Sequence, residues 1–383
     1  LGAGGIGMSA LVRYFLSEGK FVAGYDRTPS KLTDSLIEEG AQLHFEEDEE
    51  LIPAECKEPA STLVIFTPAI PAGHKEWKLF REGGFTIKKR AEVLGIITRD
   101  KNGVCAAGTH GKTTTSTMTA HLLHQSSVDC AAFLGGISKN YKSNLILSDK
   151  SDLVVIEADE YDRSFLHLEP YIATITSADP DHLDIYGTPE AMVEAFAEFA
   201  SQIKRGGALV LKQGVNLKFD TSERALYRYS CDEGGDFHAK NIELLEGGYY
   251  RYDIVMPDGR IEGCTLGILG KVHIENSIAA VAMLWCAAKI EGKTLDYNKL
   301  RRALREFEGV KRRMEVYVNT PEQVYIDDYA HHPEELRATM TSLRGIFPGR
   351  RLVAVFRPHL YTRTRDFAKE FAVLLAKGLH LGL

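Results

Sequence analysis

The stretch Val104-Cys-Ala-Ala-Gly-Thr-His-Gly-Lys-Thr-Thr-Thr115 predicts a buried strand, a tight glycine turn and the first turn of a helix. It nearly matches the pattern G-x-x-x-x-G-K-[ST], with Ala106 in place of the first glycine. Gly108 and Gly111 let the backbone turn so that its N–H groups point inward, toward phosphate oxygens. The positive end of the helix that begins near Lys112 adds to the attraction for anions. The stretch therefore predicts an α/β unit with a phosphate-binding loop.

The polar side chains of this loop fit the charges of a nucleotide triphosphate. Lys112 is placed to bridge the β- and γ-phosphates, and the hydroxyl of Thr113 stands where a magnesium ligand belongs. Because strand, turn, lysine and hydroxyls all appear in register, a chance glycine turn is a poor explanation. The predicted nucleotide contacts are Gly108, Thr109, His110, Gly111, Lys112, Thr113 and Thr114.

The chain as a whole has the composition of a packed globular protein. Its 383 residues correspond to about two or three domains of roughly 150 residues. Hydrophobic residues make up 44% and charged residues 26%, which is too apolar for a disordered chain. The net charge of −7 argues against a general nucleic-acid coat protein, which would normally be basic.

Two further features bear on the cellular compartment. The longest apolar run, residues 278–288, is far shorter than the ~20 residues that a membrane helix needs, so no membrane insertion is expected. The six cysteines form no C-x-x-C pair, which argues against a zinc site and a disulfide framework. Scattered cysteines of this kind are typical of a reducing compartment, and we expect a cytoplasmic protein.

Short apolar runs alternate along the chain with stretches at helical spacing. This alternation predicts α/β layers with mostly parallel sheets. Ligands of such sheets bind beyond the carboxyl ends of the strands, so the loops that follow strands are the places to search. The predicted strands cover residues 21–25, 62–66, 103–107, 153–157, 171–176, 208–211 and 352–356, and the clearest helices cover 8–17 and 189–202.

The organisation of the chain predicts three units, at residues 1–100, 101–310 and 311–383. The second begins just before the phosphate-binding loop and contains a turn-rich excursion at 213–268, with β-like pieces at 249–255 and 264–268. The chain opens directly on Leu-Gly-Ala-Gly-Gly-Ile-Gly and stops at Leu-Leu-Ala-Lys-Gly-Leu-His-Leu-Gly-Leu. We expect both ends to be cut and the third unit to be incomplete.

Two acidic segments follow predicted strands near the phosphate-binding loop. In the segment 153–160, Glu157 is the first polar residue after the apolar run and is our choice for a magnesium ligand, with Asp159 and Glu160 as alternatives. The segment 177–184 places three aspartates and His182 in one short loop. Imidazole is an unusual magnesium ligand, and turn chemistry with helix capping explains this loop equally well on local grounds.

The first residues carry a second glycine motif. Gly2-Ala-Gly-Gly-Ile-Gly7 matches G-x-G-x-x-G, and Asp26 follows the next predicted strand. This arrangement suits a nucleotide pyrophosphate at a helix N-terminus. Taken alone the motif is weak, and NAD is a competing interpretation because Asp26 would also suit a ribose hydroxyl.

The C-terminal part combines acids, histidines and arginines. Asp327-Asp-Tyr-Ala-His-His-Pro333 is followed by Arg357-Pro-His-Leu-Tyr-Thr-Arg-Thr-Arg-Asp366. Arginine forks bind carboxylates and phosphates, so the second stretch suits an anionic ligand. Two adjacent histidines after a predicted strand favour a functional role over simple packing.

Taken together and in this order, Gly-Thr-His-Gly-Lys-Thr-Thr-Thr, Glu-Ala-Asp-Glu, Asp-Asp-Tyr-Ala-His-His-Pro and Pro-His-Leu-Tyr-Thr-Arg-Thr-Arg-Asp resemble the Mur ligases from Gly2 to about Phe371. The resemblance implies a Rossmann-like N-terminal domain for a UDP sugar, a central P-loop ATPase domain with a mostly parallel sheet, and a truncated Rossmann-like C-terminal domain for an amino acid. Within the family it favours the branch that joins L-alanine to UDP-N-acetylmuramate. The alternative is the branch that adds a recycled murein tripeptide to the same sugar nucleotide.

The resemblance also implies a reaction and its partners. ATP would activate the lactyl carboxylate of UDP-N-acetylmuramate as an acyl phosphate, which the amine of L-alanine would attack, with Mg²⁺ as the metal cofactor. The setting would be cytoplasmic peptidoglycan precursor synthesis, by a monomer or homodimer. The residue types agree, because a lysine and a cation have to neutralise two anions that must meet.

Roles carry over from the family by position. Lys112, Glu157, His182 and His331 would be catalytic, and Thr113, Glu157 and His182 would hold magnesium. Asn276, Arg313 and Asp328 would contact the adenine, phosphates and ribose of ATP. Gly2, Gly4, Gly5 and Gly7 would hold the UDP diphosphate, Gly135, Gly136 and Asn144 the muramoyl group, and Arg363 the alanine or product. The adenine-side segment departs from many relatives at Val272 and His273.

Two other classes explain less of the sequence. An NAD-dependent oxidoreductase would account for the N-terminal glycines and leave the phosphate-binding loop and the arginine–histidine stretches without a role. A P-loop switch or binding module would hydrolyse ATP only to drive a conformational change. A ligase differs from it by being nearly silent without its carboxylate substrate.

Overall fold

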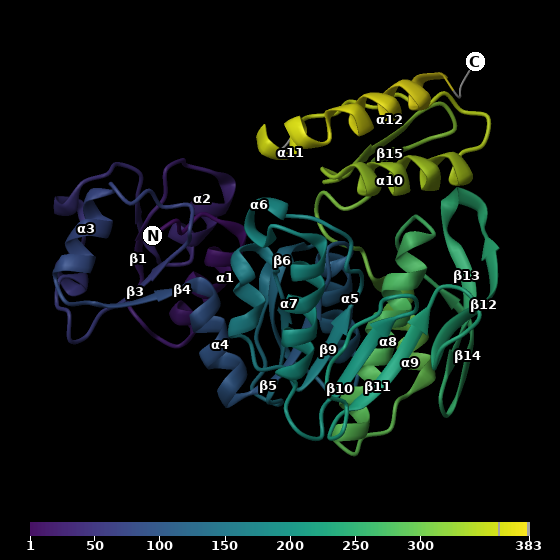
Figure 1. The fold of residues 1–383 in the computed structure, drawn as a ribbon, viewed down its shortest axis with the longest axis horizontal. Coiled ribbons are helices and arrows are strands. Elements are labelled where there is room, and N and C mark those ends of the chain that lie inside the picture. Colours follow the sequence, from purple (N-terminus) through teal and green to yellow (C-terminus); the bar gives the residue numbers. More distant parts are fainter. Residues whose placement is uncertain (359–360, 381–383) are drawn as a thin grey trace.

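The computed structural model describes residues 1–358 and 361–380 and arranges them in three groups of elements. In Figure 1 the N-terminal group lies at the left, the large central sheet in the middle, and the C-terminal group above that sheet. The boundaries at residues 100 and 310 stay predictions, although the sheets fall in separate segments of the chain.

The N-terminal group contains two small parallel strand pairs. β1 (Ala23–Tyr25) pairs with β2 (Gln42–His44), and β3 (Leu63–Phe66) pairs with β4 (Thr86–Lys89). The strands predicted at 21–25 and 62–66 are therefore confirmed, each somewhat shorter than expected. The helices are α1 (Ile6–Ser17), α2 (Lys31–Glu38), α3 (Lys75–Glu82) and α4 (Arg90–Asp100).

The central sheet has ten strands in the order β14-β13-β12-β11-β10-β9-β5-β8-β6-β7. Its middle, from β11 to β6, is parallel. The parallel strands confirm the runs predicted at 103–107, 153–157, 171–176 and 208–211. They are β5 (Asn102–Ala107), β6 (Ala131–Ser138), β8 (Leu153–Glu157), β9 (Ile172–Ile175), β10 (Ala208–Lys212) and β11 (Ala225–Ser230).

Antiparallel strands close both edges of this sheet. β7 (Ser143–Ile146) pairs with β6 at one edge. At the other edge β12 (Phe237–Leu244), which is parallel to β11, is followed by β13 (Tyr250–Met256) and β14 (Gly259–Thr265). The predicted β-like excursion is thus a continuation of the central sheet.

Helices cover both faces of the central sheet, and the strand residues alternate accordingly. Val104 and Val155 face one cluster of buried side chains, whereas Cys105 and Ile156 face the other. Since successive side chains of a strand point to opposite faces, strands buried on both sides read as continuous apolar runs. The first face carries α5 (Lys112–Gln125), α8 (Val272–Ile290) and α9 (Tyr297–Glu306), and the second carries α4, α7 (Pro189–Ser201) and the 3-10 helix η3 (Tyr161–His167).

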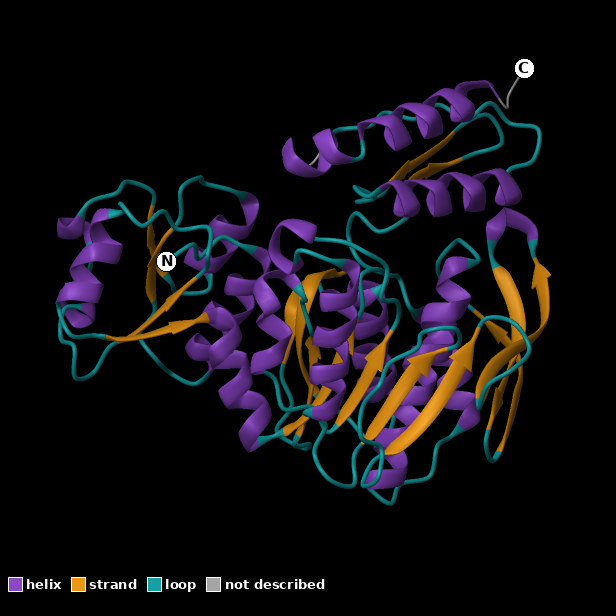
Figure 2. Cartoon of the chain, viewed as in Figure 1, coloured by secondary structure: helices purple, strands orange, loops and turns teal. Residues whose placement is uncertain are grey.

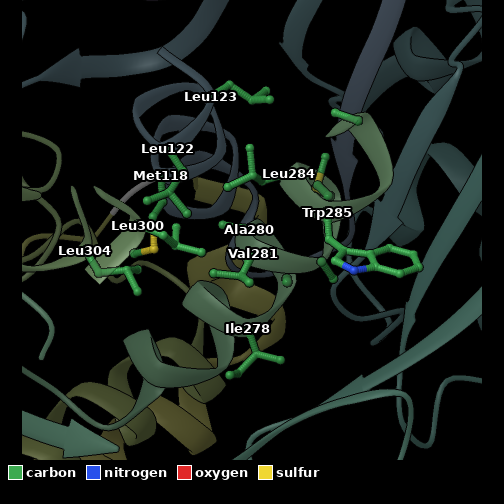
Figure 3. Packing of buried hydrophobic residues seen from close by; sticks show 14 of the residues in the cluster. Met118, Leu122, Leu123, Ile278, Ala280, Val281, Leu284, Trp285, Leu300 and Leu304 are labelled. Carbon is green, nitrogen blue, oxygen red and sulfur yellow. The ribbon is translucent and has the colours of Figure 1, made fainter. Parts of the chain in front are cut away.

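The helix α8 forms the centre of the first face. Figure 3 shows Ile278, Val281 and Leu284 of α8 among side chains of α5 and α9. The longest apolar run of the sequence, residues 278–288, is therefore a helix segment inside the core. Over the described ranges 1–358 and 361–380, no helix combines the length and apolar character needed to cross a bilayer.

The C-terminal group differs from the prediction. It contains an antiparallel pair, β15 (Glu315–Asn319) and β16 (Val324–Asp327), with α10 (Pro333–Ile346), α11 (Tyr361–Asp366) and α12 (Ala368–His380). The strand predicted at 352–356 is wrong, because residues 351–358 form no strand. An apolar run becomes a strand only where a neighbour accepts its hydrogen bonds. Val355 is instead 97% exposed.

The C-terminal group lies over the ends of the central strands. Figure 2 shows the arrowheads of the strands labelled β10 and β11 in Figure 1 pointing toward this group. Loops that follow the parallel strands therefore face α10 and α11. This is the edge at which open α/β sheets bind ligands.

We predict that Leu284→Ala lowers the free energy of unfolding by about 2–5 kcal/mol, because the fully buried side chain leaves a cavity in the core. Leu226→Ala is the control, since its side chain is 37% exposed, and its loss should stay within about 1 kcal/mol. Urea unfolding followed by circular dichroism measures both. Equal losses would contradict the placement of α8 in the core.

Candidate active site

The phosphate-binding loop follows the central strand β5 and leads into α5. Gly108 has φ +126° and Gly111 has φ +83°, a region that favours glycine. A Cβ on Gly108 would lie 2.3 Å from Oγ1 of Thr176, so a side chain has no room there. The neighbouring loop supports the turn, because the N–H of His110 donates to Oγ of Ser177 at 2.9 Å. The predicted strand–turn–helix is confirmed as a structure.

Lys112 lies at the start of α5 with its ammonium group enclosed. Nζ donates to the carbonyl of Gly108 at 2.8 Å and lies 2.9 and 2.7 Å from the two carboxylate oxygens of Glu160. The side chain of Glu160 is 1% exposed. Its backbone carbonyl accepts from the hydroxyl of Tyr186 at 2.6 Å, which fixes this part of the loop. The loop lysine is thus held by a buried carboxylate.

The charges of this pair depend on each other. Burial opposes the charge of Lys112, but Glu160, Asp159 and Glu157 outweigh it, so the pKa of Lys112 is raised. Burial raises the pKa of Glu160 to about 7, and Asp159 adds to this, while Lys112 works in the opposite direction. The site therefore concentrates negative charge around one lysine.

Thr113 and Glu157 form an oxygen pair beside this lysine. The hydroxyl of Thr113 donates to Oε1 of Glu157 at 3.1 Å. Oε2 of Glu157 is buried and has no hydrogen-bond partner among the described residues. A Cβ on Gly135 would lie 2.1 Å from that oxygen, so the glycine makes room for it. An unpartnered carboxylate oxygen next to a hydroxyl fits a hard cation such as Mg²⁺.

Within the described ranges, no group of three histidine, cysteine or carboxylate side chains is placed to hold a metal ion by itself. Magnesium in phosphate-transfer sites takes only one or two protein oxygens and completes its shell with phosphates and water. The pair Thr113 and Glu157 therefore fits a magnesium site in which phosphate and water oxygens supply the remaining ligands.

His182 and Arg363 meet at Asp181, in the loop that follows β9. The Nε2 of His182 lies 3.6 Å from Oδ2 of Asp181 and 4.0 Å from Oε1 of Glu160. Nη2 of Arg363 lies 3.4 Å from both carboxylate oxygens of Asp181. Burial lowers the pKa of His182, with Asp181 opposing it. Residues from two segments that are far apart in the sequence thus share one buried carboxylate.

Arg313 reaches the phosphate-binding loop from the C-terminal group, in which Asp328 and His331 lie on the loop after β16. Nη2 of Arg313 lies 3.4 Å from Oγ1 of Thr113, on the phosphate-binding loop. Nδ1 of His331 lies 2.7 Å from the carbonyl oxygen of Tyr329, and burial lowers the pKa of its ring. Asp328 accepts from Thr339 and from the N–H of Met314, so in this arrangement it shapes the loop that carries Arg313.

Asn276 lies behind the loop, on α8. Its Oδ1 accepts from the hydroxyl of Thr115 at 3.4 Å, and its Nδ2 lies 3.3 Å from Nδ1 of His273. His273 is buried, and burial together with Arg313 lowers the pKa of its ring to about 4. The predicted adenine residue Asn276 therefore sits beside a neutral, buried histidine.

The N-terminal glycines open onto the same site. A cleft of about 360 Å³ is lined by Gly2, Gly5 and Gly7 on one side and by Gly135 and Glu157 on the other. Gly4 contributes differently, since its N–H donates to Oδ2 of Asp26 at 2.7 Å. Asp26, which the NAD interpretation would assign to a ribose hydroxyl, thus accepts a hydrogen bond from the glycine turn itself.

Two predicted muramoyl contacts lie apart from the cleft lining. Asn144 is fully buried, and its amide bonds to Ser9 at 2.9 Å, to the carbonyl of Ile6 and to Arg13. In this arrangement it ties α1 to the edge strand β7 and has no free donor for a ligand. Gly136 faces Val310, where a Cβ would lie 2.5 Å from Cγ1.

The sequence favoured Glu157 as the magnesium ligand, with Asp159 and Glu160 as alternatives, and in the structure Glu157 and Glu160 have different partners. Glu157 pairs with the hydroxyl of Thr113, and Glu160 pairs with Lys112. Glu335 was not identified as a site residue from the sequence. Its place three residues after His332 is a helix-capping signal that was available in the sequence.

Comparisons with known families and structures bear directly on this site. The chain matches the catalytic domain of the Mur ligase family over residues 1–102, the Mur ligase middle domain over 106–284, and the Mur ligase glutamate ligase domain over 312–381. The UDP-N-acetylmuramate–L-alanine ligase of Phocaeicola vulgatus is 55% identical over 373 residues, which cover 97% of this chain and 80% of the relative. The ligase of the same name from Porphyromonas gingivalis (strain W83) is 51% identical over 375 residues, with coverage of 97% and 80%.

Solved structures agree with the sequence relatives. The UDP-N-acetylmuramate–alanine ligase of Thermotoga maritima superposes with a TM-score of 0.80 at 26% identity, covering 99% of this chain and 82% of that one. A murein peptide ligase from Psychrobacter arcticus gives a TM-score of 0.71 at 22% identity, covering 94% and 78%. The second match shows a shared fold.

We predict that His273→Asn flattens the dependence of stability on pH. The folded protein holds His273 neutral down to about pH 4, whereas the unfolded chain takes up the proton near 6.5. The contribution of this neutral ring is therefore complete above pH 6.5 and is lost as the pH falls toward 4, by up to about 3 kcal/mol.

Urea unfolding between pH 7 and pH 4 tests this as a difference between variant and wild type. The variant should lose less free energy of unfolding than the wild type over that interval. A difference that stays constant with pH would contradict the burial of a neutral His273.

Proposed function

The chain belongs to the Mur ligase family, and on this premise we propose that it joins L-alanine to the lactyl carboxylate of UDP-N-acetylmuramate while ATP becomes ADP and phosphate. Relatives at 51–55% identity that carry this activity in their names support the substrate pair. The observation that carries the proposal is the shared cleft. It brings the N-terminal glycines and Glu157, which adjoins the phosphate-binding loop, into one space, as a reaction between a sugar nucleotide and ATP requires.

The chemistry explains why ATP is needed. A carboxylate is a poor acylating agent, because its leaving group would be an oxide. Transfer of the γ-phosphoryl group to a lactyl carboxylate oxygen forms an acyl phosphate, and the phosphate then becomes a good leaving group. The amine of L-alanine attacks the carbonyl carbon, and the tetrahedral intermediate expels inorganic phosphate.

The residues of the chain supply charge and position to the first step. Lys112, whose raised pKa keeps it charged, neutralises the transferring phosphoryl group once ATP displaces it from Glu160. Arg313 lies against Thr113 and adds a second positive group beside the loop. The backbone N–H groups around Gly108 and Gly111 complete the cradle.

Thr113 and Glu157 would hold Mg²⁺, with His182 as the predicted third residue nearby. When bound, the ion would offset negative charge on the phosphates. In the second step His331 and Arg363 would meet the incoming amino acid. Arg363 suits its carboxylate, because a guanidinium binds a carboxylate through paired hydrogen bonds.

The same proposal assigns the three units. Residues 1–100 would bind the UDP sugar, 101–310 would bind ATP, and 311–383 would deliver the amino acid. The diphosphate would lie on Gly2, Gly5 and Gly7, which line the cleft. We place the reaction in the cytoplasm, where peptidoglycan precursors and ATP are both present.

We predict that Lys112→Ala lowers turnover by at least about 100-fold, because the developing phosphoryl charge loses its buried positive partner. Lys150→Ala is the control, since this exposed lysine lies in the loop after β7, and its turnover should be unchanged. Phosphate release with ATP, Mg²⁺, UDP-N-acetylmuramate and L-alanine measures both, and circular dichroism checks the fold. Retained turnover in a folded Lys112→Ala variant would contradict the assignment of the phosphate-binding loop.

The amine substrate is tested in the same assay by replacing L-alanine with the L-Ala-D-Glu-diaminopimelate tripeptide. We expect release with L-alanine and little with the tripeptide. Release with the tripeptide alone would reassign the chain to the recycling branch. Silence with both amines would contradict the proposed substrates.

A further inference from the structure

The carboxylate of Glu335 lies between two loops of the candidate site, the His331–His332 loop and the phosphate-binding loop. It stands in the first turn of α10, and its side chain is 17% exposed. Oε2 accepts the backbone N–H of His331 at 3.0 Å and that of His332 at 3.3 Å, and it lies 3.3 Å from Nδ1 of His331. One oxygen of Glu335 therefore defines the shape of the loop that carries His331.

The other oxygen of Glu335 faces the phosphate-binding loop. Oε1 lies 3.6 Å from Nδ1 of His110. On the far side of the same imidazole, Nε2 lies 3.5 Å from Oδ2 of Asp179. The ring of His332 lies beside that of His110, with 5.5 Å between centroids. His110 thus lies between a carboxylate of the central unit, Asp179, and a carboxylate of the C-terminal unit, Glu335.

The imidazole of His110 is incompletely satisfied. Both of its ring nitrogens are buried and lack a hydrogen-bond partner among the described residues. A buried polar atom without a partner costs free energy, so a small approach of Glu335 to His110 would be favourable.

Helix capping explains the contacts of only one of the two carboxylate oxygens of Glu335. The cap of α10 uses Oε2, which accepts the backbone N–H of His332. Oε1 has no part in the cap and points at a residue more than two hundred positions earlier in the chain. The geometry of Glu335 therefore calls for a second role.

We propose that Glu335 is a positioning residue that holds the His331–His332 loop in register with the phosphate-binding loop through His110. The inference rests on the proposed function, in which an amine delivered near His331 meets an acyl phosphate formed beside Lys112. Misplacement of reacting groups by about 1 Å can cost about 100-fold in rate. The contact would thus matter most for the step that uses the amino acid.

Glu335→Gln tests this because its amide oxygen still accepts the loop N–H groups while the charge that faces His110 is removed. Glu334→Gln is the matched control, since Glu334 is the preceding residue of the same helix turn, is 55% exposed and pairs with Arg337. We expect Glu335→Gln to lower kcat/KM for L-alanine by about 10-fold or more, with KM for ATP within about 3-fold of the wild type. The control should stay within about 2-fold of the wild type.

A double-mutant cycle with His110→Asn separates positioning from capping. If the two residues act through each other, the double variant is about as slow as the slower single variant. Losses that multiply would overturn the proposal, and so would a Glu335→Gln variant that matches the control.

Urea unfolding of the wild type, Glu335→Gln, His110→Asn and the double variant gives a readout that does not depend on the substrate. Coupled effects of Glu335 and His110 on unfolding support the contact, and additive effects overturn it. If the wild type releases no phosphate with either amine, the proposed function fails, and the unfolding cycle decides the inference separately.

Discussion

A lysine buried among carboxylates is the constraint on which this site depends. Lys112 is held by Glu160 and by the carbonyl of Gly108, and its charge is kept by the acids around it. Taking such charges out of water is costly unless they are paired, so the surrounding loops are fixed by the need to pair them. Tyr186, Thr113 and Asp181 each hold one of those loops. The parallel sheet supplies the frame, because β5 lies between β8 and β9 and the carboxyl ends of the three strands are at the same edge.

Much of this frame was predictable from the sequence, and for a physical reason. Strands buried on both faces read as continuous apolar runs, so the runs at 103–107 and 153–157 identified β5 and β8. The glycines of the loop after β5 marked a backbone that only glycine adopts easily. The strand predicted at 352–356 was wrong, because the apolar content of a run does not show whether a neighbouring strand is present to pair with it. The strands that the third unit does form are an antiparallel pair earlier in the chain, at residues 315–319 and 324–327.

The side-chain partners were harder to predict, since they join distant segments. Local sequence favoured Glu157 and kept Glu160 as an alternative, because both lie at the carboxyl end of the same strand and only their partners on α5 distinguish them. Asn144 resembled a substrate contact, but tertiary packing uses its amide to hold α1. Glu335 showed a capping signal, whereas its second oxygen faces a loop of the central unit. The proposed site combines loops from the three predicted units, and the residue spacing within one segment carries no information about the other two.

The central claim is that phosphoryl transfer activates the lactyl carboxylate before the amine attacks its carbonyl carbon. The most direct test uses UDP-N-acetylmuramate with ¹⁸O in both lactyl carboxylate oxygens, together with ATP, Mg²⁺ and L-alanine. Mass spectrometry of the released phosphate should show one ¹⁸O atom in each phosphate, because the acyl phosphate carries a carboxylate oxygen away with the leaving group. Unlabelled phosphate, with the amide product formed, would contradict this account.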